Sequence, residues 1–271
     1  MSNAKNISVV MATYKNDICL QIREAIESIV NQSLKVDEFI IVIDGEIPQK
    51  NDVLLQGYSK KYSIKLLYLK ENMGPGAARN YGVSAARNEL IAIMDADDIS
   101  RENRVEMQYS EFCNYEVDVV GGYINEFFET ASQPSRRRIV PTNHDDILKY
   151  ARKRSPVNNV TLMFKKSIFE RVGGYSETTY MEDYDLVIRL LEHGAIFRNL
   201  PEVLVDVRVD ADLFLRRGGF TLAKRELHFF IHHWKNGFFS TENMVFGILT
   251  RLPIRLIPSH LRAFIYSHLL R

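Results

Sequence analysis

Four short apolar runs, separated by segments of helical periodicity, constrain the fold of this chain more than any other feature. The runs have the length and β-branched content of buried strands, and they cover residues 7–12, 39–43, 64–69 and 91–94. Apolar residues recur at helical spacing between Ile18 and Asn31, and residues 53–62 and 77–86 also predict helices. This alternation predicts βαβ units with right-handed crossovers and a mostly parallel α/β sheet that has helices on both faces.

The fourth apolar run leads directly into Asp95-Ala96-Asp97-Asp98. Carboxylates this close repel one another, and burying them without compensation is costly. A hard divalent cation such as Mg²⁺ or Mn²⁺ removes that conflict, and Mg²⁺ is commonly shared between one or two carboxylates and the phosphates of a substrate. Asp95 and Asp97 therefore predict a metal–diphosphate clamp. The alternative is a solvated acidic turn in which Asp98 or Ser100 caps the next helix.

Polar residues follow the ends of all four runs, and a parallel sheet brings such ends to one edge. The candidate nucleotide-binding residues are Thr13, Tyr14, Asp44, Asn72, Gly74 and Arg79. Tyr14 offers a face on which a base can stack, and Asp44 offers an acceptor for a base or a ribose. Gly74 permits close backbone approach at the start of a helix, where N–H groups favour anions. Each residue also has a purely structural explanation, but their order along the chain favours a binding site.

The second half of the chain predicts helices over residues 101–114, 145–152 and 166–172 and strands over 117–122 and 160–164. A loop over residues 130–138 ends in Arg136-Arg137-Arg138, which either contacts phosphates or forms a solvated turn. Glu182-Asp183 opens a further helix, where the helix dipole favours an ionised carboxylate. Asp183 is a candidate general base, or it is a plain N-cap. Glu182 is a candidate for orienting that base or the acceptor substrate from which the base would take a proton.

Charge is distributed unevenly along the 271 residues, although the net charge is +1 and gives no reason to expect a nucleic-acid partner. Residues 216–271 hold nine Lys or Arg and two acids, whereas the remaining residues hold 26 and 32. We therefore divide the chain into a catalytic domain, residues 1–215, and a basic helical tail, residues 216–271. Cys19 and Cys113 suit a reducing compartment, and neither a signal peptide nor a membrane-spanning run is visible.

The tail combines basic residues with amphipathic helical patterns over residues 221–234, 241–249 and 259–270. This pattern suits an anionic membrane surface, so we expect a cytoplasmic protein that is peripheral on the inner face of the membrane. Alternatively, the tail helices cover the catalytic domain or a twin subunit in a homodimer. His232-His233 is interpreted as a satisfied interfacial pair, because no third ligand lies at metal spacing.

Taken in order, these motifs resemble the family 2 glycosyltransferases, which have the GT-A fold and make bacterial surface polysaccharides. The matching motifs are residues 8–14, Asp44-Gly45, Asn72-x-Gly74-x-x-x-Ala78-Arg79-Asn80-x-Gly82, Asp95-Ala96-Asp97-Asp98 and Glu182-Asp183. Later segments resemble the exopolysaccharide and capsule branch, including amylovoran-type transferases. They are residues 182–186, 201–205, 207–209 and 216–219.

The resemblance implies an inverting transfer of one sugar from a nucleotide-diphosphate sugar, by default a UDP-sugar, with Mn²⁺ or Mg²⁺ as cofactor. It implies a nucleotide-sugar half over about residues 7–98, an acceptor half over about 99–215, and a lipid-linked or oligosaccharide acceptor. Residue by residue, Thr13, Tyr14 and Asp44 would hold the nucleoside, Asp95 would face the ribose, Asp97 would bind the metal and Asp183 would be the base. The Gln-x-x-Arg-Trp pattern of processive synthases is missing, which favours a single addition.

Three other functions fit the sequence less well. A sugar-phosphate nucleotidyltransferase needs a Gly-rich loop with Lys or Arg directly after the first strand, where this chain has Ala12-Thr13-Tyr14. A nicotinamide-dependent oxidoreductase needs Gly-x-Gly-x-x-Gly at the same place. An idle nucleotide-sugar or polysaccharide binder has no need to keep both Asp97 and Asp183.

Overall fold

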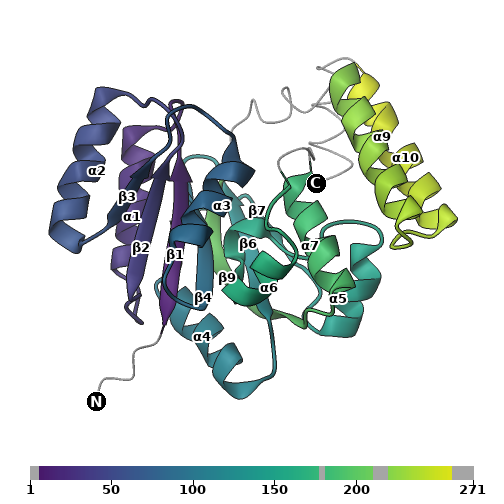
Figure 1. The fold of residues 1–271 in the computed structure, drawn as a ribbon, viewed down its shortest axis with the longest axis horizontal. Coiled ribbons are helices and arrows are strands. Elements are labelled where there is room, and N and C mark those ends of the chain that lie inside the picture. The colour runs from purple at the N-terminus through teal and green to yellow at the C-terminus, as the bar shows by residue number, and fades with distance from the viewer. Residues whose placement is uncertain (1–5, 177–180, 210–218, 258–271) are drawn as a thin grey trace.

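A single mixed sheet runs through the computed structural model, which describes residues 6–176, 181–209 and 219–257. In the described residues its strand order is β3-β2-β1-β4-β8-β6-β9-β5, and β7 pairs with β6 (Figure 1). The first half of the chain alternates strands and helices as follows: β1 (Ile7–Thr13), α1 (Cys19–Val30), β2 (Glu38–Ile43), α2 (Gln49–Tyr62), β3 (Lys65–Tyr68), α3 (Pro75–Ala85) and β4 (Leu90–Asp95).

The first four strands are parallel, because β1 pairs with both β2 and β4, and β2 pairs with β3. Their carboxyl ends therefore lie at one edge of the sheet, as the alternation predicts. In the second half, β8 runs antiparallel between β4 and β6, whereas β6 and β9 are parallel. Its elements are β5 (Ile99–Ser100), α4 (Arg104–Asn114), β6 (Val119–Phe127), β7 (Arg136–Arg138), α5 (His144–Ala151), β8 (Met163–Lys165), α6 (Lys166–Arg171), α7 (Glu182–Glu192) and β9 (Phe197–Arg208).

Successive strand residues point to opposite faces, and this period of two separates two hydrophobic cores. Val9 and Met11 of β1 pack with α1, α2 and α4, whereas Val10 packs with α3, α5, α6 and α7. Helices therefore cover both faces, which confirms the predicted α/β class. The α3 backbone lies close to the sheet at Gly82, where an added Cβ would come within 2.4 Å of a Val10 methyl group.

Two further helices, α9 (Phe220–Lys235) and α10 (Thr241–Leu256), form a pair beside α7 (Figure 1). Phe229, Phe230 and Phe239 pack against Tyr184 and Ile188 of α7 in a third apolar cluster. The helix pair is thus attached to α7 through a buried aromatic contact. None of the helices within the described ranges is long and apolar enough to cross a membrane.

Several local predictions differ from the structure. Residues 136–138 form strand β7 instead of a loop, and residues 159–161 form a 3₁₀ turn before β8. Helix α4 begins three residues later than expected, because Ile99 and Ser100 first pair with β9. Neither Asp98 nor Ser100 caps α4, since Asn103 precedes it. The helix expected over residues 259–270 lies outside the described residues.

Candidate active site

The loop after β1 is held by a carboxylate that sequence reasoning missed. Asp17 Oδ2 accepts hydrogen bonds from Thr13 Oγ1 at 2.9 Å and from the Tyr14 backbone N–H at 3.0 Å. The Tyr14 side chain is left 37% exposed at the sheet edge, where its ring is accessible for stacking. Burial raises the pKa of Asp17 against the opposing effect of these hydrogen bonds, and the nearby charge of Asp95 adds to the rise.

The loops after β2 and β3 are joined by Asp44. Its carboxylate is buried and accepts hydrogen bonds from the Met73 and Gly74 N–H groups at 2.7 and 3.0 Å, and Asn72 Nδ2 donates to its backbone carbonyl. Gly74 has φ +91° at the start of α3, a conformation that side chains disfavour. The predicted residues Asp44, Asn72 and Gly74 are therefore brought together, with Asp44 fixing the shape of the loop.

The three carboxylates after β4 have different environments. Asp98 is buried, and its Oδ1 accepts a hydrogen bond from the Arg208 backbone N–H at 2.9 Å, which ties β4 to the end of β9. Asp95 is about one third exposed and is bonded by Arg79, whereas the Asp97 side chain is exposed. Asp98 is thus a structural tether, and Asp95 and Asp97 remain as the outward-facing pair.

The carboxylate oxygens at this edge of the sheet are suitable ligands for a hard cation. Desolvation by the surrounding protein and the negative charges of Asp95 and Asp17 raise the pKa of Asp97 to about 6. Within the described ranges, no other side chain pairs with the Asp97 carboxylate. No group of three His, Cys, Asp or Glu side chains forms a closed metal cage in the described part of the chain. A pair of carboxylates suits Mg²⁺ or Mn²⁺, which take their remaining ligands from substrate phosphates and water.

Arg79 links the acidic edge to the start of α7. Its Nη2 lies 2.6 Å from Asp95 Oδ1, its Nη1 lies 3.6 Å from Asp183 Oδ1, and its guanidinium lies over the Tyr175 ring. Burial alone would lower the pKa of Arg79, but the two carboxylates outweigh that effect and raise it. The predicted residues Arg79, Asp95 and Asp183 therefore form one ion-pair chain.

Asp183 is the second residue of α7. Part of its side chain is accessible, but Oδ1 is shielded and accepts no hydrogen bond from the described residues. Desolvation by the surrounding protein raises the pKa of Asp183 to about 7, with Arg79 opposing the shift and Glu182 adding to it. Burial likewise raises the pKa of Glu182. Asp183 can therefore gain and lose a proton near neutral pH.

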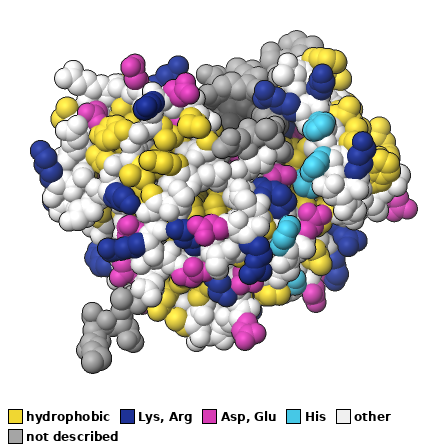
Figure 2. All heavy atoms as spheres, in the orientation of Figure 1, with side chains coloured by type: hydrophobic (Ala, Val, Ile, Leu, Met, Phe, Trp, Pro, Cys, Tyr) yellow, Lys and Arg dark blue, Asp and Glu magenta, His cyan; other side chains and the backbone are white. Residues whose placement is uncertain are grey.

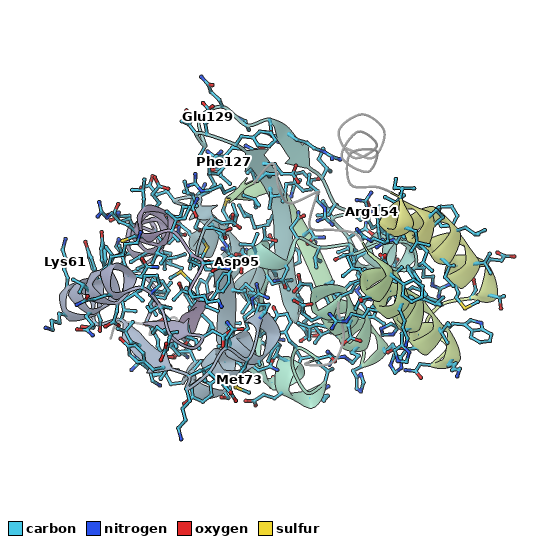
Figure 3. All side chains as sticks on the ribbon, turned by 90° about the horizontal axis from the view of Figure 1, so that it is seen from above. Lys61, Met73, Asp95, Phe127, Glu129 and Arg154 are labelled. Carbon is cyan, nitrogen blue, oxygen red and sulfur yellow. The ribbon has the colours of Figure 1, made fainter. Side chains whose placement is uncertain are left out.

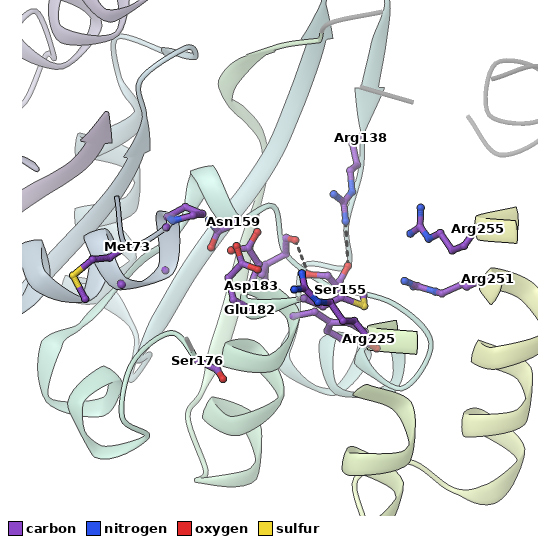
Figure 4. Close-up of a pocket in the computed structure, with 17 residues that line it drawn as sticks. Met73, Arg138, Ser155, Asn159, Ser176, Glu182, Asp183, Arg225, Arg251 and Arg255 are labelled. Carbon is purple, nitrogen blue, oxygen red and sulfur yellow. Dashed lines mark hydrogen bonds between the residues drawn. The ribbon is translucent and has the colours of Figure 1, made fainter. Parts of the chain in front are cut away.

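Asp183 and Glu182 line a cavity of about 710 Å³ (Figure 4). The N-terminus of α3, including Gly74, forms another part of its lining. Asp95 and Asp97 do not line the cavity; Arg79 connects Asp95 to Asp183, which does line it. Figure 3 shows Asp95 near the middle of the molecule, between the helices near Lys61 and the C-terminal pair near Arg154.

Four arginines complete the cavity lining, and sequence reasoning did not place them there: Arg138, Arg225, Arg251 and Arg255. The positions of Arg225, Arg251 and Arg255 depend on how α9 and α10 pack against α7, and that of Arg138 depends on the pairing of β7 with β6; no local pattern encodes either contact. The one available signal was the basic character of residues 136–138 and of the tail.

Comparison with known proteins agrees with this arrangement. The family model for glycosyl transferase family 2 matches residues 8–173, well over half of the chain. A mannosyltransferase from Pyrobaculum calidifontis, solved in complex with GDP-Man and Mn²⁺, superposes with a TM-score of 0.66 at 17% identity. The alignment covers 97% of this chain and 74% of that chain. This likeness shows that the fold is of the GT-A type.

Two curated relatives align over nearly their whole length. The UDP-Gal:alpha-D-GlcNAc-diphosphoundecaprenol beta-1,3-galactosyltransferase of Escherichia coli is 34% identical, over 97% of this chain and 96% of its own. The amylovoran biosynthesis glycosyltransferase AmsE of Erwinia amylovora is 29% identical, over 96% of this chain and 97% of its own. The chain therefore belongs to glycosyl transferase family 2 and is a glycosyltransferase.

Proposed function

We propose that this enzyme is an inverting, metal-dependent transferase that moves one sugar from a UDP-sugar to a lipid-linked or oligosaccharide acceptor. The observation that carries the proposal is the ion-pair chain in which Arg79 joins Asp95 to Asp183, 2.6 Å from one and 3.6 Å from the other. This connection sets a candidate base beside the outward-facing aspartates and at the wall of a cavity. The relatives support a role in bacterial surface polysaccharide synthesis, since one is named for amylovoran and one uses UDP-Gal.

Donor binding is assigned to the carboxyl edge of the parallel strands. Tyr14 offers its exposed ring to the base, and Thr13, Asp17 and Asp44 hold the surrounding loops in shape. Asp97 and Asp95 are the residues that would hold Mn²⁺ or Mg²⁺ together with the donor diphosphate. When bound, the cation would neutralise the negative charge that develops on the leaving diphosphate.

Sugar transfer requires a base on the acceptor side, and Asp183 is placed for it. Its carboxylate takes the proton from the acceptor hydroxyl while that oxygen bonds to the anomeric carbon. The bond from the same carbon to the diphosphate oxygen breaks on the opposite side, and its electron pair leaves with the diphosphate. The configuration at the anomeric carbon is therefore inverted. Arg79 holds Asp183 in position and balances its charge.

Association with an anionic membrane is proposed as well, since a lipid-linked acceptor would be presented there. The outer side of α10 exposes Val245, Phe246, Leu249 and Leu256, and hydrophobic side chains gather on this part of the surface (Figure 2). These apolar side chains lie on one side of α10, as is typical of helices that lie in a membrane interface. The expected location is the inner face of the bacterial membrane.

The proposal is tested with labelled UDP-sugars, in the presence of Mn²⁺ or of a chelator, and with mass measurement of the product. We expect one sugar to be added with metal and none without it. Asp97→Asn should abolish metal-dependent UDP binding in calorimetry while leaving the thermal unfolding transition in place, because a neutral amide is a poor ligand for a hard cation.

The matched control is Glu46→Gln, which removes an exposed carboxylate from the same edge of the sheet and should bind UDP as the unmodified protein does. An unchanged UDP affinity in Asp97→Asn would refute the clamp. Transfer that is as fast with chelator as with Mn²⁺ would refute metal dependence.

A further inference from the structure

Four arginine side chains converge on the cavity that Asp183 lines. Arg138 comes from β7, Arg225 from α9, and Arg251 and Arg255 from α10. Figure 4 shows Arg138, Arg251 and Arg255 on the side of the cavity opposite Met73, with Glu182 and Asp183 between them. The cavity volume of about 710 Å³ lies within the usual range for small-molecule sites.

Among the described residues, the four arginines outnumber the three carboxylates at or beside the cavity, which are Glu182, Asp183 and Glu226. Glu226 is fully buried and pairs with Arg255 at 2.9 Å and, more weakly, with Arg251 at 3.5 Å. Arg138 donates to the Ser155 carbonyl at 3.3 Å, and no carboxylate of the described residues lies within ion-pair distance of it. Burial and the nearby Arg154 charge lower the pKa of Arg138, which is the expected response of an uncompensated cation.

The residues proposed to hold the metal and the donor diphosphate are not the ones that carry this charge. Asp95, Asp97 and the Arg79 side chain that joins Asp95 to Asp183 all lie outside the cavity lining. Met73, the neighbour of Gly74, lines the cavity on the side opposite three of the arginines. The arginines instead share the cavity with Asp183, which the proposed mechanism assigns to the acceptor hydroxyl. An anionic group bound by the arginines would therefore belong to the acceptor.

We propose that the arginine cluster (Arg138, Arg225, Arg251 and Arg255) is a subsite for the diphosphate of an acceptor whose sugar is linked through a diphosphate to a lipid. This inference rests on the proposed function. Arginine is suited to the role because its planar guanidinium binds phosphate oxygens in pairs. The sugar of such an acceptor would lie between the diphosphate and Asp183.

The test compares two acceptors that contain the same α-linked GlcNAc. In one, a diphosphate joins the sugar to an octyl chain; in the other, an octyl glycoside, the sugar is joined to the octyl chain directly. We expect the diphosphate acceptor to have the lower KM. Arg138→Gln and Arg225→Gln should each raise that KM by about tenfold or more, because a charged hydrogen bond to phosphate is lost. The KM of the glycoside and the affinity for UDP should remain as they are in the unmodified protein.

Two neighbouring substitutions serve as matched controls. Arg137→Gln changes the exposed arginine beside Arg138 on β7, and Lys224→Gln changes the exposed cation beside Arg225 on α9. Neither residue lines the arginine-bearing cavity, so both variants should keep the KM values of the unmodified protein. Thermal unfolding of all four variants shows whether each is folded.

Octyl diphosphate, which has no sugar, provides a second measurement that needs no turnover. In calorimetry it should bind the unmodified protein with an affinity that falls as the salt concentration rises. It should bind the Arg138→Gln and Arg225→Gln variants more weakly. Equal binding to all proteins would overturn the subsite, as would an equal loss of activity on both acceptors. Weakened UDP binding in these variants would assign the arginines to the donor instead. Binding without transfer from any donor would support the subsite and refute the proposed function.

Discussion

Asp183 can act as a base while it is ionised, and its surroundings place that ionisation near neutral pH. Its pKa of about 7 means that the carboxylate is mostly protonated below pH 6 and mostly ionised above pH 8. The rate should therefore rise by about tenfold per pH unit below 7 and level off above it. The pH profile of kcat/KM measures this dependence, and a profile that is flat between pH 5 and 8 would contradict it.

Replacing the base separates binding from chemistry. Asp183→Asn should keep the affinity for UDP and lower kcat by about 10²–10⁴-fold, because an amide cannot take the acceptor proton. Asp145→Asn, which alters an exposed carboxylate in the first turn of another helix, α5, serves as control and should keep its activity. Near-normal turnover in Asp183→Asn would remove this residue from the mechanism.

At the residue scale, the sequence predicted which side chains gather but not how they are connected. Asp44 was expected to face the nucleoside, and it holds the Met73 and Gly74 N–H groups. Arg79 was expected on the nucleotide side, yet it also reaches Asp183. Asp17 is not among the predicted site residues. Such contacts join residues far apart in the chain, so local patterns do not reveal them.

At the level of elements, the contact between α9 and α10 depends on one glycine. A Cβ added at Gly247 would lie 2.3 Å from a ring carbon of Phe230, which is itself buried. Gly247→Ala should therefore push the helices apart and lower the free energy of unfolding by about 1–3 kcal/mol. Urea denaturation measures this change.

The matched control for that substitution is Gly57→Ala in α2, where an added Cβ would meet no atom within 4 Å. This variant should be more stable than the unmodified protein by about 0.4–1 kcal/mol, because alanine restricts the unfolded chain. If Gly247→Ala were stabilising to the same extent, the close packing of α9 on α10 would be disproved.

Elements with a clear apolar period were predicted correctly, and short or interrupted ones were missed. The four parallel strands and α1 follow from runs or stripes of Ile, Val and Leu. Strand β9 extends through Pro201-Glu202, which interrupts its apolar pattern, and β5 has just two residues. Both strands are stabilised by distant partners, which the sequence alone does not identify.

At the scale of the whole molecule, the outer side of α10 offers an apolar surface to a membrane. Phe246 and Leu249 are 55% and 67% exposed. Changing both to serine should lower co-sedimentation with anionic liposomes at low salt by about tenfold or more, because each buried apolar side chain contributes about 1.5–3 kcal/mol. The protein should otherwise remain folded, since neither side chain is part of a core.

A control pair for this experiment is Leu20→Ser with Val53→Ser, which removes exposed apolar side chains from α1 and α2. Liposome binding should be unaffected in that protein. An equal loss in both pairs would show that exposed apolar area in general, and not the α10 surface, determines binding.

The placement of the tail could not be read from its sequence, because two outcomes share the same pattern. A basic amphipathic helix suits a membrane surface or a covering role; α9 packs on α7, whereas α10 leaves apolar side chains exposed. Phe229 and Phe230 are buried against the catalytic domain, whereas Phe246 and Leu249 face outwards. Which arginines of the tail reach the cavity depends on that docking, so their proximity to Arg138 is seen in the folded structure alone.

Helix α7 carries the candidate base at its first turn and, at Tyr184 and Ile188, the contacts that hold the tail. Asp185 adds a polar attachment, because it lies 3.1 Å from His233 of α9 and is bonded by Arg189. The cavity wall formed by the tail is thus attached to the helix that carries the candidate base, whereas the proposed donor residues follow the ends of the parallel strands. Substitutions in α9 and α10 should consequently change which acceptor the enzyme uses without changing which sugar donor it uses.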